Sequence, residues 1–334
     1  MLYGIAATII LLVAALAAAL NYAIIFPRLP FRGPLPPLTA REQDLGRRLR
    51  GHVEAVASKP HSVRYYANLE KSALYIERTL ASFGFDPRSQ RYDVEGKSVR
   101  NIEVVLEPDG GGAAKGTYVF GAHYDSPDDT PGANDNGTGV AALLELARLL
   151  AEQPPAARTH RLRLVFFVNE EQPYSWTEAM GSWRYARSLS EAGEKVVGMA
   201  ALETIGYFSD KRGSQSFPSP FGLIYPDTGN FIAFVGLPGS RRFLGRALRC
   251  FRRSAAFPAI GGVAPAFIDG VALSDHWSFH QFGYPAFMIT DTAPYRNPYY
   301  HRLNDTPANV DYESLARVTA GLDAVIRFLI GAKL

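Results

Sequence analysis

Acidic side chains and histidines follow several apolar runs of the sequence, at the points where these runs end. They are His123 and Asp125 after Thr117–Ala122, Glu170 and Glu171 after Leu162–Val168, Glu203 after Val196–Leu202, and Tyr300 and His301 beyond Ala286–Thr290. A further acid, Asp135, lies in the glycine-bounded stretch Gly132–Gly137. Carboxylates brought together repel one another and are costly to bury, and a bound cation removes that difficulty. Imidazole and carboxylate ligands without thiolate suit Zn²⁺, and also Mn²⁺ or Co²⁺.

These side chains meet only if the runs that carry them are strands of one sheet. The runs are continuously apolar and alternate with helical patterns at Val140–Leu150 and near Glu178–Ser190, which is typical of a mostly parallel sheet covered on both faces. The sequence therefore predicts an α/β fold, a three-layer α/β/α sandwich around a mostly parallel mixed sheet. Ligands of such sheets bind at the carboxyl ends of the strands, where the acids and histidines lie.

Further elements complete a single catalytic domain. Helical patterns are predicted at Arg41–Ala57, at Asn68–Phe83 and after Asp311, and a strand pair at Ser89–Val94 and Val99–Leu106. The stretch Tyr207–Pro238 is too long for a simple connection, and long loops in compact domains are usually functional. We therefore expect this stretch to serve the site.

Six short motifs resemble those of the two-zinc exopeptidase family that contains the bacterial secreted leucine aminopeptidases, which shares its fold with glutaminyl cyclases. The motifs are Gly121–Ser126, Gly132–Gly137, Asn169-Glu170-Glu171, Leu202-Glu203, Ser274-Asp275-His276 and Tyr300-His301. The resemblance extends from about Thr117 to the C-terminus. It implies a metallo-aminopeptidase with two zinc ions, which hydrolyses N-terminal residues from peptide substrates.

The resemblance also implies a role for each residue. His123, Asp135 and Glu203 would hold one zinc ion, and Asp135, Glu171 and His301 the second. Glu170 would be the general base, Tyr300 would hydrogen-bond the developing oxyanion, and Asp125 would orient the imidazole of His123. Successive side chains of a strand point to opposite sides, so one of two adjacent glutamates can ligate metal while the other faces substrate. Many family members have Asp where this chain has Glu203.

Two other functions are weighed against the peptidase. A glutaminyl-peptide cyclotransferase, an acyltransferase with a single zinc, shares the fold and is not excluded by the ligand residues. A binding module without metal is disfavoured, because all five ligands and Glu170 are present. Asp275 either orients a ligand or the substrate amine, or has a structural role. His276 and His280 are interpreted as structural, and His52, His61 and His160 as surface residues without a role.

The composition sets limits on the partners. The chain has 334 residues, of which 47% are hydrophobic and 20% charged, as in an ordinary globular protein. Its net charge of +3 is too small to indicate a nucleic-acid partner. Cys250 is the single cysteine, so an intrachain disulfide cannot form. The oligomeric state does not follow from the sequence.

The first residues differ in kind from the rest. Met1 to Pro27 carries no charged side chain, and Ile5–Phe26 is almost wholly apolar over a length that spans a bilayer as a helix. Residues 1–27 are therefore predicted to be a transmembrane anchor or a cleaved signal segment, followed by a proline-rich linker at 28–38 and the catalytic domain at 39–334. The absence of Lys and Arg before the apolar run favours an uncleaved anchor.

The location follows from this segment. We expect a membrane-anchored, extracytoplasmic protein, or a secreted one if the segment is cleaved. The arginines that follow the span, Arg28, Arg32 and Arg41, favour the opposite orientation under the positive-inside rule, with a cytoplasmic catalytic domain. Both orientations stay open.

Overall fold

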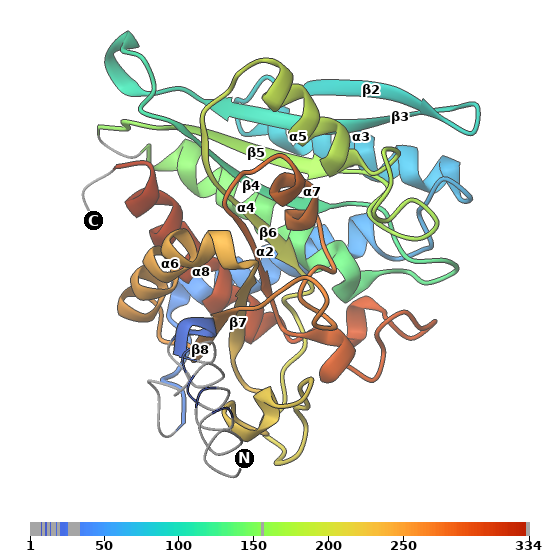
Figure 1. The fold of residues 1–334 in the computed structure, drawn as a ribbon. Helices are drawn as coiled ribbons and strands as arrows, with labels where there is room; N and C mark the ends of the chain where they lie inside the picture. The colour runs from blue at the N-terminus through green and yellow to red at the C-terminus, as the bar shows by residue number, and fades with distance from the viewer. Residues whose placement is uncertain are drawn as a thin grey trace.

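A mixed β-sheet forms the centre of the computed structural model, which describes residues 8, 11, 14, 18, 21–25, 34–154 and 157–331. In that part of the chain the sheet has nine strands in the order β1-β8-β7-β9-β6-β4-β5-β3-β2 (Figure 1). The strands are β1 (Ile24–Ile25), β2 (Arg88–Val94), β3 (Lys97–Leu106), β4 (Thr117–His123), β5 (Arg161–Phe167), β6 (Val196–Glu203), β7 (Ile232–Gly236), β8 (Ala259–Val263) and β9 (Ala286–Thr290).

The strands that precede the candidate ligands are parallel neighbours. The pairs β5–β4, β4–β6 and β6–β9 are parallel, so the carboxyl ends of these four strands lie at one edge. A hairpin of β2 and β3 extends the sheet antiparallel to β5. On the other side, β7 runs antiparallel to β9, β8 is parallel to β7, and β1 is antiparallel to β8. The predicted α/β class is confirmed.

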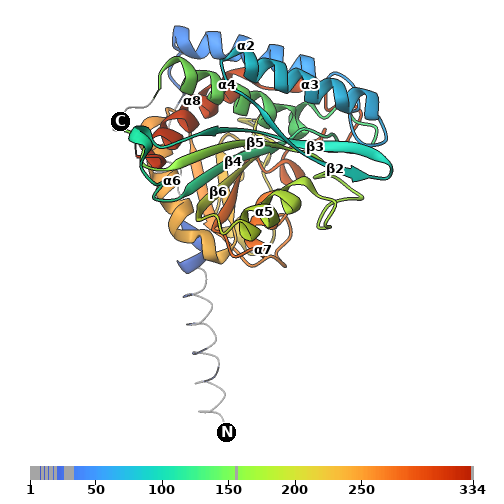
Figure 2. The ribbon, with the colours of Figure 1, turned by 90° about the horizontal axis from the view of Figure 1, so that it is seen from above.

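Helices cover both faces of this sheet. Those described are α2 (Ala40–Val56), α3 (Tyr66–Ser82), α4 (Thr138–Glu152), α5 (Gly181–Glu191), α6 (Arg241–Ser254), α7 (His276–Gln281) and α8 (Tyr312–Leu329). Figure 2 shows α2, α3, α4 and α8 on one side of the sheet and α5 and α7 on the other. Helix α6 joins the larger core through Phe243, Leu244 and Phe251, so the arrangement is the predicted three-layer sandwich.

Local sequence signals account for the helices beside the site. Thr39 and Glu42 form a reciprocal capping box at the start of α2, with the Glu42 amide 3.2 Å from Thr39 Oγ1 and the Thr39 amide 2.8 Å from Glu42 Oε2. Asp311 caps α8 by accepting from the Ser314 amide at 3.0 Å. Helix α4 is buried from Thr138 to Leu150, as its apolar residues on all sides predict.

Several elements were missed by the sequence analysis. The predicted loop Tyr207–Pro238 contains strand β7, and β8 and α7 were not predicted at all. Strand β8 reads Ala-Ile-Gly-Gly-Val, and two glycines in five residues weaken a strand signal because they offer no side chain to pack. Helix α7 spans 6 residues, too few for a clear helical period.

The N-terminal boundaries also need correction. Ile24 and Ile25 form β1 and pair with β8, although they were assigned to an apolar helix outside the catalytic domain. The rest of the predicted segment Ile5–Phe26 lies mostly outside the described residues, among which no helix has the length and apolarity needed to cross a membrane. At the end of the predicted linker, Leu35 packs on the core and Pro36 accepts a hydrogen bond from Arg317 through its carbonyl.

Two helix glycines give opposite predictions for stability. A Cβ on Gly321 in α8 would lie 2.5 Å from the Phe251 ring of α6 and 2.7 Å from Ala255 Cβ. We expect Gly321→Ala to lower the free energy of unfolding by about 1–3 kcal/mol through overpacking. Gly51 in α2 has nothing within 4 Å of that position, so Gly51→Ala should raise it by about 0.5–1 kcal/mol.

Denaturant unfolding of both variants beside the parent protein measures these changes. Equal effects of the two substitutions would show that α6 and α8 do not approach as closely at Gly321 as described.

Candidate metal centre

The five predicted metal ligands come from five separate segments and lie together at the carboxyl edge of the sheet. His123 and Glu203 are the last residues of β4 and β6, and Glu171 follows β5. Asp135 lies in the irregular turn Ala133–Gly137 before α4, and His301 in the loop between β9 and α8. The structure therefore brings all five predicted residues together.

Asp135 lies between the two histidines. Its Oδ1 is 3.4 Å from His123 Nε2, and its Oδ2 is 3.0 Å from His301 Nε2. Each histidine also approaches a glutamate: His123 Nε2 is 3.4 Å from Glu203 Oε2, and His301 Nε2 is 3.6 Å from Glu171 Oε1. The side chain of Glu203 thus reaches His123. Two groups of three ligands result, with Asp135 common to both.

These residues fit zinc ions in their spacing. Three of the four contacts are 3.4–3.6 Å long, beyond ordinary hydrogen-bond distance, and the buried His123 Nε2 makes no hydrogen bond within the described part of the chain. Atoms that share one tetrahedral zinc ion, each about 2.0–2.2 Å from it, lie about 3.4 Å apart. Ligand atoms of His123, Asp135 and Glu171 all lie within 4.8 Å of one another.

The electrostatics of the cluster also call for a cation. Burial and then the carboxylates of Asp135 and Glu170 raise the pKa of Glu171 well above its usual range. Burial also raises the pKa of Glu203, and that of Glu170, against the lowering effect of nearby His123. Without an added positive charge these acids would tend to bind protons instead. A metal ion is often the largest local charge and reverses that tendency.

Asp125 connects the ends of β4 and β5. Its two carboxylate oxygens accept hydrogen bonds from the backbone amides of Glu170 and Glu171, at 3.1 and 3.2 Å. The Nδ1 atom of His123 is 3.0 Å from the Asp125 carbonyl oxygen and 3.5 Å from its Oδ1. Asp125 therefore fixes the backbone of both glutamates as well as the ring of His123, and only the second role was inferred from the sequence.

The turn that carries Asp135 is held by residues that the sequence analysis did not select. The carboxylate of Asp305 accepts from the backbone amides of Asn134 and Asp135 at 2.8 and 3.0 Å. Asn136 donates to the Leu202 carbonyl at 2.7 Å and accepts from the Thr204 amide at 3.1 Å, which ties the turn to the end of β6. No spacing in the sequence identifies Asp305 as a partner of a turn 170 residues away.

The backbone changes direction abruptly beyond three of the strands. Asn169, Thr204 and Thr292 have φ values of 61°, 47° and 65°, and His301 has 54°. This left-handed region is unfavourable for side chains, above all for β-branched threonine, and such residues gather at functional sites. The strain turns the glutamates after β5 and the loop after β9 toward the same edge.

The remaining candidates occupy different environments. Tyr300 stacks on His301 with ring centroids 4.0 Å apart, and burial followed by nearby carboxylates raises its pKa far above the usual value. Asp275 is buried, and burial raises its pKa to about 7. The neighbouring Ser274 donates to Glu203 Oε2 at 2.8 Å. His276 is buried and bonded to the Val271 carbonyl, which is consistent with a structural role.

Two histidines interpreted as surface residues are not on the surface. His61 is 1% exposed, its backbone amide donates to Ser126 Oγ at 2.9 Å, and burial lowers its pKa to about 4. His52 is largely covered and lies 3.1 Å from Glu145 of α4. Both predictions were wrong. His61 is covered in the loop that contacts Ser126, and His52 faces Tyr75 of α3 and Glu145 of α4. A short sequence window does not reveal contacts between such distant residues.

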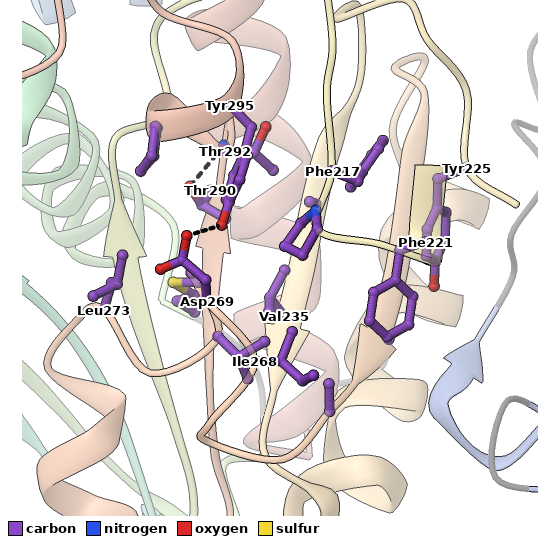
Figure 3. Close-up of a pocket in the computed structure, with 18 of the residues that line it drawn as sticks. Phe217, Phe221, Tyr225, Val235, Ile268, Asp269, Leu273, Thr290, Thr292 and Tyr295 are labelled. Carbon is purple, nitrogen blue, oxygen red and sulfur yellow. Dashed lines mark hydrogen bonds between the residues drawn. The ribbon is translucent and has the colours of Figure 1, made fainter. Parts of the chain in front are cut away.

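An apolar pocket adjoins the candidate ligands, and its lining includes the ligand Glu203 and Tyr300, which stacks on His301. Figure 3 shows Val235 and Thr290 beneath it, with Phe217, Phe221 and Tyr225 on one side and Ile268, Asp269 and Leu273 on the other. Its volume is about 110 Å³. The three aromatic residues belong to the stretch Tyr207–Pro238, so that stretch does line a cavity at the candidate centre.

Comparisons with known proteins agree with this geometry. The chain is 37% identical over 309 residues to the uncharacterised protein YfbL of Escherichia coli, covering 90% of this chain and 91% of that one. It is 30% identical over 225 residues to a probable leucine aminopeptidase of Trichophyton verrucosum, with 63% and 52% coverage. The chain therefore spans about half the length of that fungal relative.

Solved structures share the fold at low sequence identity. The zinc aminopeptidase of Bacillus subtilis superposes with a TM-score of 0.66 at 15% identity, covering 88% of this chain and 96% of the other. A glutaminyl cyclase from Bacteroides thetaiotaomicron gives a TM-score of 0.62 at 18% identity, with 88% and 99% coverage. At these identities the likeness establishes the fold alone.

The family follows from the sequence match. Residues 101–224 and 251–326, together more than half of the chain, match the profile of Peptidase family M28. These ranges include all five candidate ligands, Asp125, Glu170 and Tyr300. The match confirms the expectation of a metallo-aminopeptidase-type hydrolase, and the chain belongs to Peptidase family M28.

Proposed function

We propose that this protein is a zinc-dependent exopeptidase that removes N-terminal residues with apolar side chains from peptides. One observation carries the proposal: two groups of candidate metal ligands joined by Asp135 lie beside an apolar pocket, whose lining includes Glu203 and the tyrosine next to His301, Tyr300. A peptide bond at the ligands would then place the adjacent side chain in the pocket. Pockets of this kind bind apolar groups and use a few polar residues to orient them.

In this proposal His123, Asp135 and Glu203 hold one zinc ion, and Asp135, Glu171 and His301 hold a second. Bound zinc would acidify a water molecule and polarise the scissile carbonyl. The His301 side chain is 41% exposed, whereas His123 is fully buried. Solvent and substrate therefore reach the centre from the His301 side.

Glu170 is the proposed general base. Its backbone is fixed by the bond from its amide to Asp125, and its carboxylate is crowded by buried neighbours. Such a group takes a proton from the attacking water and returns it to the leaving amine. Tyr300 lies at the boundary between the ligands and the pocket, where its hydroxyl can donate to the oxygen that gains charge in the transition state.

A glutaminyl-peptide cyclotransferase remains the alternative, because a glutaminyl cyclase shares the fold. In the peptidase, water attacks the peptide carbonyl and the amine of the next residue leaves. In the cyclase, the α-amine of an N-terminal glutamine attacks the carbonyl of its own side-chain amide, and ammonia leaves. The second group of ligands, Asp135, Glu171 and His301, favours the peptidase, since the cyclotransferase reading needs a single zinc.

Peptides with matched ends separate these functions. We expect the zinc-loaded protein to release leucine from Leu-Gly-Gly and to leave its N-acetylated form intact. With Gln-Gly-Gly, a peptidase releases glutamine, whereas a cyclase forms a pyroglutamyl peptide without cleavage, and mass spectrometry distinguishes the products. Chelation should abolish the release of leucine and added zinc should restore it. Full turnover in a metal-free preparation would exclude the proposed mechanism.

Substitution of the adjacent glutamates separates base from ligand. Glu170→Gln should keep its metal but lose about 10²–10⁴-fold in turnover, the usual effect of losing a positioned general base. Glu171→Gln should bind metal more weakly, because an amide is a poor substitute for an anionic ligand, and excess zinc should restore part of its activity. Both variants lose the same charge, so each serves as the control of the other.

Elemental analysis beside turnover decides between the roles. Metal loss in Glu170→Gln with retention in Glu171→Gln would reverse the two assignments.

We also propose that residues before Tyr22 hold the protein to a membrane, because they carry no charged side chain and are almost wholly apolar. The full-length chain should then stay in the membrane fraction through a high-salt wash. Recovery of a soluble form that starts near Ala19 would indicate a cleaved signal segment instead.

A further inference from the structure

Residues 22–25 lie against the catalytic domain at the outer edge of the sheet. Ile24 and Ile25 pair with Gly262 and Gly261 of β8. The Tyr22 hydroxyl donates to the Pro238 carbonyl at 3.1 Å. These contacts attach the N-terminal segment to an edge strand that would otherwise present unpaired backbone groups to solvent.

An arginine at the start of α6 strengthens the attachment. Arg241 Nε donates to the Tyr22 carbonyl at 2.6 Å, and its guanidinium lies 5.0 Å from the centre of the Tyr22 ring. Ile25 is buried in the core on this side, close to Gly245 of α6. Hydrogen bonds and a cation–π contact thus act on Tyr22, strand pairing acts on Ile24 and Ile25, and apolar burial acts on Ile25.

The same residues reach the pocket beside the metal centre. Ala23 is one of its lining residues. A Cβ on Gly262 would lie 3.0 Å from the Ala23 carbonyl oxygen and 2.7 Å from the Tyr225 hydroxyl, and that hydroxyl donates to the Gly261 carbonyl at 3.0 Å. Ala23 and Tyr225 therefore both lie against Gly262, and the absence of a side chain there permits this close approach.

The pocket connects this junction with the metal ligands. Its lining runs from Glu203 and Tyr300 across Met288 of β9, Val235 of β7 and Ile260 of β8 to Ala23. Figure 3 shows Phe221 and Tyr225 at the end of the pocket nearest the N-terminal strand. A side chain that enters beside the ligands thus extends along the sheet toward β1.

We propose that Ala23 forms the outer wall of the substrate side-chain pocket, and that the attachment of this segment through Tyr22, Ile24 and Ile25 sets the preference for large apolar N-terminal residues. This inference rests on the proposed exopeptidase function. Without the wall, the far end of a long side chain would contact water, whereas a short side chain would not reach that far. Loss of apolar burial therefore weakens binding of large side chains selectively.

The test uses full-length, zinc-loaded protein and two substitutions at the attachment, outside the lining of the pocket. Tyr22→Ala removes the aromatic contact and the bond to Pro238, and Arg241→Ala removes the bond to the Tyr22 carbonyl. Arg242→Ala, an exposed arginine of the same helix, is the matched control. The substrates are the p-nitroanilides of phenylalanine, leucine and alanine.

We expect kcat/KM for the phenylalanine substrate to fall by about tenfold in Tyr22→Ala and Arg241→Ala. The value for the alanine substrate should stay within about twofold, and Arg242→Ala should change neither. Equal losses of kcat/KM for the phenylalanine and alanine substrates would indicate general destabilisation and overturn the inference. An unchanged kcat/KM for phenylalanine in both variants would overturn it as well. Thermal melting of each variant shows whether the fold is retained.

Calorimetric binding of free phenylalanine and free alanine gives a readout that needs no turnover. Phenylalanine should bind Tyr22→Ala about tenfold more weakly than the parent protein, with alanine unaffected. If the parent protein hydrolyses none of the anilides, the proposed function is wrong, and this binding ratio alone decides whether residues 22–25 complete the pocket. If the ratio of phenylalanine affinity to alanine affinity is the same in Tyr22→Ala and in the parent protein, the proposed outer wall of the pocket is wrong.

Discussion

Negative charge is concentrated at the carboxyl edge of the sheet, where Asp135 lies with one carboxylate oxygen near His123 and the other near His301. Glu171 and Glu203 are also buried, and each lies within 3.6 Å of one of these histidines. Such an arrangement is tolerable only if a positive charge compensates it. The spacing of the ligand atoms fits zinc, and much of the surrounding structure serves to hold these acids in place.

Hydrogen bonds from backbone amides fix the segments that carry these acids. Asp125 accepts from the amides of Glu170 and Glu171, and Asp305 accepts from those of Asn134 and Asp135. Two acids outside the proposed ligand set thereby fix the segments that carry Glu170, Glu171 and Asp135. Because these bonds act on the main chain, they set the direction of neighbouring side chains as well.

The two halves of the sheet have different tasks. Parallel strands β5, β4, β6 and β9 deliver residues to the metal centre, because parallel strands end at a common edge. The extension through β7 and β8 to β1 is partly antiparallel and supports the apolar pocket. Chemistry and side-chain selection therefore lie next to each other on one continuous surface, with Glu203 and Tyr300 at the boundary. The glutaminyl cyclase that shares this fold shows that the architecture alone does not fix the reaction.

The sequence alone determined the central sheet and indicated which side chains gather at its carboxyl edge. Long apolar strands, each followed by an acid or a histidine, have a clear period and a clear end, so His123, Glu171 and Glu203 were placed correctly. Asp135 and His301 followed from the resemblance of their motifs. The family match then confirmed the class of enzyme.

Only the tertiary structure revealed the residues that support the site and the attachment of the N-terminal segment to the edge of the sheet. Asp305 acts across 170 residues, β8 has two glycines where a strand signal needs side chains, and His61 is buried by a loop distant in sequence. The attachment of Ile24 and Ile25 to β8 was missed for a related reason: in an almost wholly apolar segment, nothing local marks which residues join a sheet. Contacts between distant segments depend on how the whole chain packs, and local patterns of residue type do not contain that information.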